Sequence, residues 1–148
     1  MTLTLFGRWQ TRILLMTLLG LPITAVHVLL NNTASGPFYV LGYVLLFGLG
    51  WDLLYNYIQG LRWNRDWPPL FALYAGLWEG ACLYVLMQVA LPVWERFGLS
   101  LLPGVPVFVP IARFWLHYGL VFAPTYLASL GLLHVLLPHW RYRGGQWL

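Results

Sequence analysis

Charged side chains are scarce in this chain of 148 residues. Eight Lys+Arg and four Asp+Glu make up 8% of the sequence, whereas 60% of the residues are hydrophobic. A soluble domain carries roughly 25% charged residues to hydrate its surface, so a water-soluble globular protein is nearly excluded. Disordered chains are poor in apolar and aromatic residues, so disorder is excluded as well. The composition predicts one small membrane-embedded domain over residues 1–148.

Cysteine and lysine are also scarce or absent. Cys82 is the single cysteine, which excludes an intramolecular disulfide, a CxxC redox pair and a cysteine-based zinc site. The sequence has no lysine, so arginine carries all the formal positive charge. The arginines are spread as pairs and singles without a basic stripe, so nucleic acid is not an expected partner. The expected partner is the lipid bilayer, within which the arginines indicate orientation.

Four long apolar segments follow one another along the chain, over residues 13–30, 37–58, 69–93 and 114–137. A helix needs about 20 such residues to cross the hydrocarbon core, so we predict an all-α integral membrane protein with a four-transmembrane-helix bundle. Two arginines ahead of the first run also fit a signal peptide. No convincing A-x-A cleavage site follows the run, so we expect it to be a span. The apolar, proline-rich loop 94–113 is expected to be interfacial, re-entrant or a contact surface for another subunit.

The arginines predict the orientation of these four helices. Six of them lie on the side of the two termini, against Arg96 and Arg113 on the other side. The positive-inside rule therefore predicts cytoplasmic N- and C-termini, in a bacterial-type inner membrane or an intracytoplasmic, thylakoid-like membrane. The six arginines are Arg8, Arg12, Arg62, Arg65, Arg141 and Arg143.

Each apolar segment carries a line of small and polar residues at helical spacing. Membrane helices pack through such residues, because lipid tails are as apolar as leucine. Lines on all four segments favour a single bundle in which these residues face inward. The third segment adds Ala72-x3-Gly76-x3-Gly80, which predicts a ridge where a neighbouring helix approaches closely.

Two histidines lie at matched depth near one end of the first and fourth segments. His27 is about 6 Å and His117 about 5 Å from the helix end, given a rise of about 1.5 Å per residue. Both lie on the inward lines, an arrangement that suits the axial ligands of a haem or of a chlorophyll-type pigment. The simpler interpretation is that each imidazole hydrogen-bonds a backbone carbonyl or a facing Thr, Tyr or Asn. We favour the simpler one, because no motif surrounds either histidine, and we predict no metal site.

Two carboxylates lie inside the apolar segments, where ionisable groups are costly and therefore candidates for function. Asp52 and Glu79 belong to consecutive segments joined by a short loop, so we expect them on facing helices. If they meet, repulsion favours protonation of one of them, which would suit a proton or cation path. A structural hydrogen bond to Tyr55, or an ion pair with an arginine reaching up from the loop, is the alternative that we favour.

Two stretches near the expected cytoplasmic surface combine arginine with tryptophan. Such pairs bind lipid headgroup phosphates through bidentate hydrogen bonds and cation–π contacts, and they equally suit the docking of another subunit. A plain interfacial anchor is the simplest interpretation. The residues concerned are Arg62, Trp63, Arg65 and Trp67 in the loop, and Trp140, Arg141 and Arg143 near the C-terminus.

The sequence contains none of the common catalytic signatures. A phosphate-binding loop, a GxSxG turn and an HExxH helix are all lacking, so we do not expect an enzyme. The leading hypothesis is a small polytopic subunit with an accessory role in a larger complex of integral membrane proteins. One alternative is a cofactor-binding subunit of an electron-transfer or light-harvesting assembly, through His27 and His117. Another is a small proton or ion conductor that uses Asp52 and Glu79.

Overall fold

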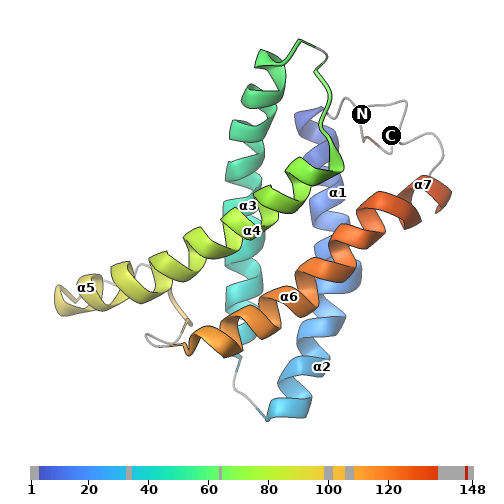
Figure 1. Ribbon diagram of the computed structural model, residues 1–148. Coiled ribbons are helices and arrows are strands. Elements are labelled where there is room, and N and C mark those ends of the chain that lie inside the picture. Colours follow the sequence, from blue (N-terminus) through green and yellow to red (C-terminus); the bar gives the residue numbers. More distant parts are fainter. Residues whose placement is uncertain are drawn as a thin grey trace.

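The computed structural model describes residues 4–32, 35–63, 65–98, 102–105, 109–136 and 146. All regular secondary structure in these ranges is helical (Figure 1), which confirms the all-α class. Three helices are long and apolar enough to cross a membrane: Leu5–Asn31, Gly36–Leu61 and Pro69–Trp94. These lengths confirm the coarse prediction of a membrane protein, because about 20 apolar residues suffice to cross the bilayer.

The first long helix consists of α1 (Leu5–Leu15), a π-helical stretch (Met16–Gly20) and α2 (Leu21–Asn31). Thr4 caps its start, since the Thr4 hydroxyl accepts a hydrogen bond from the Gly7 amide at 3.1 Å. The π-helical stretch comes just before Pro22. Proline lacks the amide N–H and crowds the preceding turn, and a widened turn accommodates both defects.

The first helix starts eight residues before the predicted span, which begins at residue 13. The helix begins at Leu5, so Arg8 and Arg12 lie within it rather than ahead of it, and the Arg8 side chain is buried. The predicted span begins directly after Arg12, because an isolated arginine in a membrane helix is costly. Acidic side chains on other helices remove most of that cost for Arg12.

The remaining helices lie close to their predicted positions. α3 spans Gly36–Leu61, and its Pro37 lies in the first turn, where a proline costs no hydrogen bond. The third long helix consists of α4 (Pro69–Val85), a π-helical stretch (Leu86–Ala90) and α5 (Leu91–Arg96). The fourth consists of α6 (Ile111–Leu127), a π-helical stretch (Ala128–Leu132) and α7 (Leu133–Leu136).

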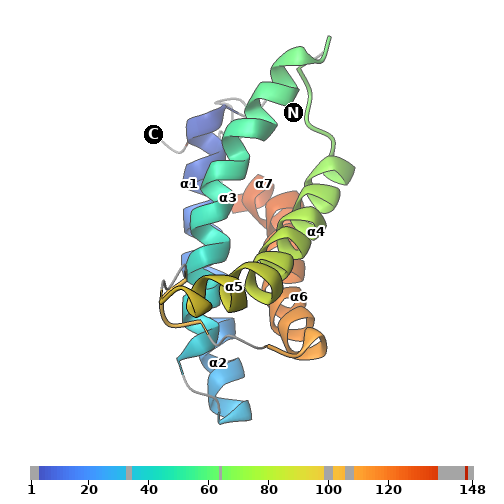
Figure 2. The same cartoon turned by 90° about the vertical axis from the view of Figure 1, so that its left-hand side faces the viewer.

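The helices form two layers of two, as Figure 2 shows from the side. One layer pairs α1 and α2 with α3, and the other pairs α4 and α5 with α6 and α7. The layers cross at a steep angle in Figure 1 and touch around the middle of the first helix, where α6 packs on the Met16–Gly20 stretch. The shared apolar core lies at this crossing and includes Met16, Leu41, Val44, Leu83, Met87, Phe114, Tyr118 and Val121.

Glycines on α4 allow the close approach of α6. A Cβ atom added to Gly76 would overlap the ring of Phe122, and one added to Gly80 would lie 2.7 Å from Cε1 of Tyr118. The Tyr118 hydroxyl donates a hydrogen bond to the Gly76 carbonyl at 2.5 Å. The predicted small-residue ridge is therefore a contact surface, and it receives aromatic rings of α6.

The described part of the loop before α6 folds back on the helices. Leu102 is buried in the apolar core, and the Tyr43 hydroxyl donates to the Pro103 carbonyl at 3.1 Å. Gln88 donates from Nε2 to the Val109 carbonyl at 2.8 Å. These bonds satisfy backbone carbonyls of an apolar segment, as burial in a membrane protein requires.

Candidate functional site

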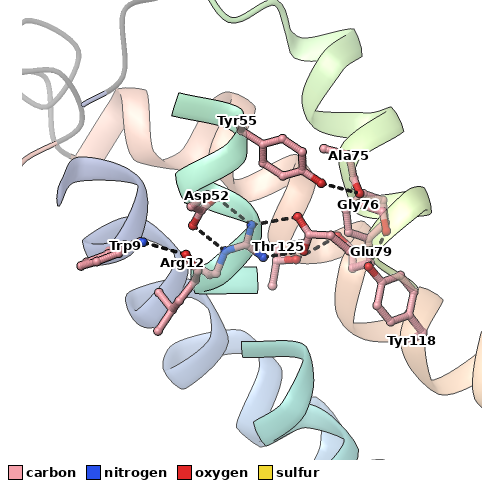
Figure 3. Close-up of polar contacts among 11 residues, drawn as sticks. Trp9, Arg12, Asp52, Tyr55, Ala75, Gly76, Glu79, Tyr118 and Thr125 are labelled. Carbon is pink, nitrogen blue, oxygen red and sulfur yellow. Dashed lines mark hydrogen bonds and ion pairs between the residues drawn. The ribbon is translucent and has the colours of Figure 1, made fainter. Parts of the chain in front are cut away.

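One arginine joins two carboxylates from two other helices at the interface of the layers. Arg12 of α1 lies between Asp52 of α3 and Glu79 of α4 (Figure 3). Its Nε and Nη2 atoms donate to Asp52 at 2.9 and 3.0 Å. Its Nη1 and Nη2 atoms donate to Glu79 at 2.8 and 3.0 Å. Both ion pairs are therefore bidentate, the strongest geometry for this pair of groups. We call these three residues the triad.

The two carboxylates of the triad are almost completely buried within the protein, and the Arg12 side chain is 18% exposed. Asp52 is 3% exposed and Glu79 is 7% exposed. Asp52 and Glu79 lie in the same site, as expected for facing helices, and the Arg12 guanidinium lies between them. The ion pair anticipated from the sequence is thus present, and its arginine comes from the first helix rather than from a loop.

The sequence of α3 makes room for the guanidinium. Gly48 lies one turn before Asp52, so the two residues share a face of the helix. A Cβ atom added to Gly48 would lie 2.7 Å from Cζ of Arg12. On the neighbouring turn, Trp9 donates from Nε1 to the Leu49 carbonyl at 3.1 Å and ties α1 to α3. These contacts fix the arginine against the backbone of α3.

Hydroxyl groups around the triad are bonded to helix backbone. The Tyr55 hydroxyl donates to the Ala75 carbonyl at 3.5 Å. Thr125 donates to the carbonyls of Val121 and Phe122 at 3.0 and 2.9 Å. Figure 3 shows the Tyr55, Tyr118 and Thr125 side chains grouped around the carboxylates. These hydroxyl groups make the surroundings of the carboxylates polar without adding charge.

A second arginine, Arg8, lies one helical turn before Arg12 on α1. Arg8 donates from Nη2 to Oε1 of Gln59 at 2.5 Å, and its guanidinium lies over the Trp67 ring, 4.4 Å from the centroid. Gln59 in turn donates to the Arg65 carbonyl at 2.8 Å. The Arg8 Nε atom is buried and has no hydrogen-bond partner among the described residues. Arg8 thus joins α1 to the segment that connects α3 and α4.

A cavity of about 480 Å³ lies between the two layers. Its charged end contains the triad, Arg8 and Asp66, and its other end reaches His117. Aliphatic side chains form the wall between the two ends, and they come from the first helix, α3 and α6. These side chains include Leu15, Met16, Val40, Leu41, Val44 and Val121.

His27 and His117 are brought together, with ring centroids 4.9 Å apart. Nε2 of His117 lies 2.9 Å from the hydroxyl of Thr24, which is fully buried. The rings are in contact, so the porphyrin plane that bis-histidine ligation places between two imidazoles has no room. The described residues also contain no group of three His, Cys, Asp or Glu side chains placed to hold a metal ion. The geometry matches the simpler interpretation, a histidine bonded to a facing threonine.

The loop residues predicted to contact lipid or partners differ in exposure. Trp63 is fully exposed and Arg65 is exposed. Arg62 is half-buried, with its guanidinium 4.7 Å from the centroid of the Phe71 ring. Trp67 is buried beneath Arg8, so it packs inside the protein. Trp140, Arg141 and Arg143 lie outside the described residues.

Arg8 and Arg12 were not predicted to belong to this site, whereas Gln59 lies on the inward line of the second segment with Asp52. A signal for the arginines was present in their spacing. Arg8 and Arg12 are four residues apart and so share a helix face, and the structure turns both toward other helices. Starting the segment at Arg8 would have placed both arginines on one face of the helix, but the π-helical stretch that aligns this face with Thr24 is not visible in the spacing.

Comparisons with protein-family models, curated proteins and solved structures give no match to this chain. The function of the site is therefore inferred from its own chemistry.

Proposed function

We propose that this chain is an integral membrane protein of four spans that binds a small amphiphilic molecule in its central cavity, without catalysing a reaction. The cavity between the layers carries this proposal. Ligand sites are typically concave spaces of about 300–1,000 Å³ with apolar walls and a few convergent polar groups. A cavity of about 480 Å³ with an aliphatic wall and the triad at one end fits that description.

The buried triad also favours a ligand-binding role. Burying an ion pair is often no more stabilising than packing apolar side chains of the same volume, because the charges lose their hydration. Ionisable groups inside membrane helices usually mark a functional site for that reason. Arg12, Asp52 and Glu79 all line the cavity, so a ligand there would contact them directly.

The proposed topology has four crossings and both termini on the cytoplasmic side. The helix from Ile111 to Leu136 runs beside α4 in the second layer, as a fourth span would. Gln146 donates from Nε2 to the Thr4 hydroxyl at 3.0 Å, so the two ends of the chain lie together. Arg62 and Arg65 follow α3 at that same end, which favours the cytoplasmic side.

Filling the cavity is expected to weaken ligand binding. Ala72 lines the cavity, whereas Ala81, on the same helix, is not among the described lining residues. Ala72→Leu should weaken the binding of a neutral lipophilic probe such as N-phenyl-1-naphthylamine about tenfold, since overpacking costs about 1–3 kcal/mol. Ala81→Leu is the matched control, and native mass spectrometry counts bound probe in both. Equal binding by the two variants would refute the proposed site.

A second candidate function is the accessory role in a larger complex, and the arm formed by the end of α4 and α5 favours it. In Figure 1 this arm extends away from the other helices. Exposed apolar side chains recur along it at helical spacing, which suits a groove of another membrane subunit. They are Val85, Val89, Val93, Trp94 and Phe97.

A photo-crosslinking amino acid at Val89 tests this accessory role. If the arm docks on a partner, the crosslinker at Val89 should yield one discrete heavier species in intact membranes. The same crosslinker at Leu29, which is exposed on α2, should yield lipid adducts only. Lipid adducts at both positions would exclude docking through the arm.

A further inference from the structure

We propose that the cavity takes up a single-chain lipid with an uncharged polyol headgroup, such as a monoacylglycerol, through an opening between α4 and α6. This inference rests on the proposed ligand-binding function and names the chemical class of the ligand. Its basis is the place where the cavity opens, the length of its aliphatic part and the polar groups at its charged end.

The opening of the cavity lies between the start of α4 and the stretch that follows α6. The cavity is open on one side, and its exposed lining residues, Pro69 and Leu130, come from these two places. The Tyr126 hydroxyl donates to the Pro69 carbonyl at 3.2 Å across the same gap. The lining residues of the first helix and α3 are buried apart from Arg12, whose side chain is 18% exposed. The first layer therefore closes the opposite side of the cavity.

Apolar side chains flank the residues of the opening. Leu70 follows Pro69 in the chain and is 52% exposed, and Leu127 follows Tyr126 and is 64% exposed. Exposed apolar surface of this kind marks contact with a membrane or a ligand. A molecule dissolved in the bilayer therefore reaches the opening without passing through water.

The aliphatic part of the cavity has the length of a lipid chain. On α3 the lining residues run from Asp52 back to Val40, twelve residues that span about 18 Å at about 1.5 Å per residue. The hydrocarbon core of a bilayer is about 30 Å thick, so one leaflet accounts for about 15 Å. The charged end lies beside the opening, because Arg8 contacts Trp67, two residues before Pro69. A chain that enters from the opening passes the triad, lies along the aliphatic wall and leaves its headgroup at the charged end.

The headgroup must provide the preference for one lipid over another. A lipid chain lies in hydrocarbon in the bilayer and among aliphatic side chains in the cavity, and lipid tails are as apolar as leucine. Transfer of the chain from one to the other therefore supplies little free energy.

Polar groups at the charged end require both donors and acceptors of a ligand. Each oxygen of Asp52 and Glu79 accepts one hydrogen bond from Arg12, and a carboxylate has about four acceptor sites. Arg8 lines the cavity and is 8% exposed, and its Nε–H has no hydrogen-bond partner among the described residues. Side chains one helical turn apart, such as Arg8 and Arg12, have Cβ atoms about 5–6 Å apart. A polyol headgroup carries several hydroxyls that both donate and accept, so it serves the carboxylates and the Arg8 N–H together.

A charged headgroup would serve only one half of this end. An ammonium group has no acceptor for the Arg8 N–H, and a carboxylate has no donor for the oxygens of Asp52 and Glu79. Either ion would also bring a further charge into the interior, where the loss of hydration costs far more than it does for a hydroxyl. The cavity therefore favours a headgroup that is uncharged and carries more than one hydroxyl.

The test compares ligands that share one long chain and differ in the headgroup: monooleoylglycerol, methyl oleate, oleic acid and oleylamine. Native mass spectrometry of the purified full chain counts each bound ligand, with the Ala72→Leu variant giving the background. We expect monooleoylglycerol to bind about tenfold more tightly than each of the others, as its additional hydrogen bonds to charged groups predict. Glu79→Gln and Arg8→Lys should each lower its preference over methyl oleate about fivefold or more. Arg113→Gln alters an exposed charge that is not among the described lining residues, and it should leave the preference unchanged.

Two leucines near the opening test the route. Leu130→Trp places a larger side chain at the opening, whereas Leu127→Trp does so at an exposed residue that is not among the described lining residues. The uptake of monooleoylglycerol by the chain in lipid nanodiscs is followed over time by native mass spectrometry. We expect Leu130→Trp to slow the uptake several-fold and Leu127→Trp to leave the rate unchanged. Equal rates in the two variants would overturn the opening between α4 and α6.

Each alternative outcome of the headgroup comparison has a definite meaning. Equal binding of methyl oleate, or tighter binding of oleic acid or oleylamine, overturns the polyol headgroup but leaves the cavity as a binding site. A preference that survives both Glu79→Gln and Arg8→Lys also overturns it, and if Glu79→Gln fails to fold, Arg8→Lys alone decides. If no lipid binds while N-phenyl-1-naphthylamine binds the wild type more tightly than Ala72→Leu, the lipid ligand is overturned and the proposed function stands. If Ala72→Leu binds this neutral probe and the lipids as well as the wild type does, the proposed function fails as well.

Discussion

Replacing Arg12 by methionine is expected to destabilise the protein by roughly 3–5 kcal/mol, the largest effect of any single substitution proposed for it. The cause is the pair of carboxylates left behind. Asp52 and Glu79 are almost completely buried, and Arg12 provides four hydrogen bonds to them. Without the guanidinium, two like charges would face each other in the interior of the protein.

The measurement is the unfolding equilibrium in mixed detergent micelles, followed by tryptophan fluorescence. The informative control is the triple variant Arg12→Met, Asp52→Asn, Glu79→Gln, which removes all three charges together. Its stability should return to within about 1–2 kcal/mol of the wild type, because a buried charge network is often no better than neutral packing. A single Arg12→Met variant as stable as the wild type would show that the triad contributes nothing to folding.

A milder perturbation of the same site is available through two glycines of α3. A methyl group on Gly48 meets the Arg12 guanidinium, whereas one on Gly50 meets no described atom within 4 Å. Gly48→Ala should therefore destabilise the protein, and Gly50→Ala should not. The pair separates the displacement of Arg12 from the general effect of alanine on a helix.

Gly76→Ala is expected to cost about 1–3 kcal/mol, the usual range for overpacking a tight contact. The added methyl group would overlap the Phe122 ring, and the Tyr118 hydrogen bond to the Gly76 carbonyl holds α6 at this distance. The helices of the second layer would have to separate or the ring would have to leave its place. The same unfolding equilibrium measures the loss.

Gly119→Ala on α6 is the matched control for this effect, because its methyl group meets no described atom within 4 Å. It should be neutral or stabilising by up to about 1 kcal/mol, as expected for alanine in place of glycine within a helix. Phe122→Leu combined with Gly76→Ala should recover part of the lost stability. Equal stability of Gly76→Ala and Gly119→Ala would mean that α4 and α6 are not closely packed at this point.

Much of the helical framework followed from hydropathy and proline. The predicted starts of the second, third and fourth segments lie within three residues of the helix starts in the structure. Pro37 and Pro69 mark the first turns of α3 and α4. The helical faces of Asp52, Glu79, His27 and His117 were also predictable from three–four spacing. The first helix includes Arg8 and Arg12, which the predicted span left out, because hydropathy assigns a cost to charge without considering which side chains on other helices neutralise it.

The wall of the cavity was not predictable from a single sequence. Its volume depends on the steep crossing of the two layers, which the helical periodicity of one segment does not specify. Gly76 illustrates the limit. The sequence indicated a close approach at this residue, but the aromatic ring that fills the space comes from a position 46 residues later in the chain.

The π-helical stretch at Met16–Gly20 determines the angular phase of the first helix. At about 100° per residue, the twelve residues from Arg12 to Thr24 would rotate Thr24 about 120° away from the face of Arg12. A π-helical bulge absorbs one residue, which reduces the offset to about 20°. Arg12 and Thr24 thereby point toward the same interior, Arg12 to the carboxylates and Thr24 to His117. A regular α-helix of the same sequence would have turned one of these two polar groups toward the lipid.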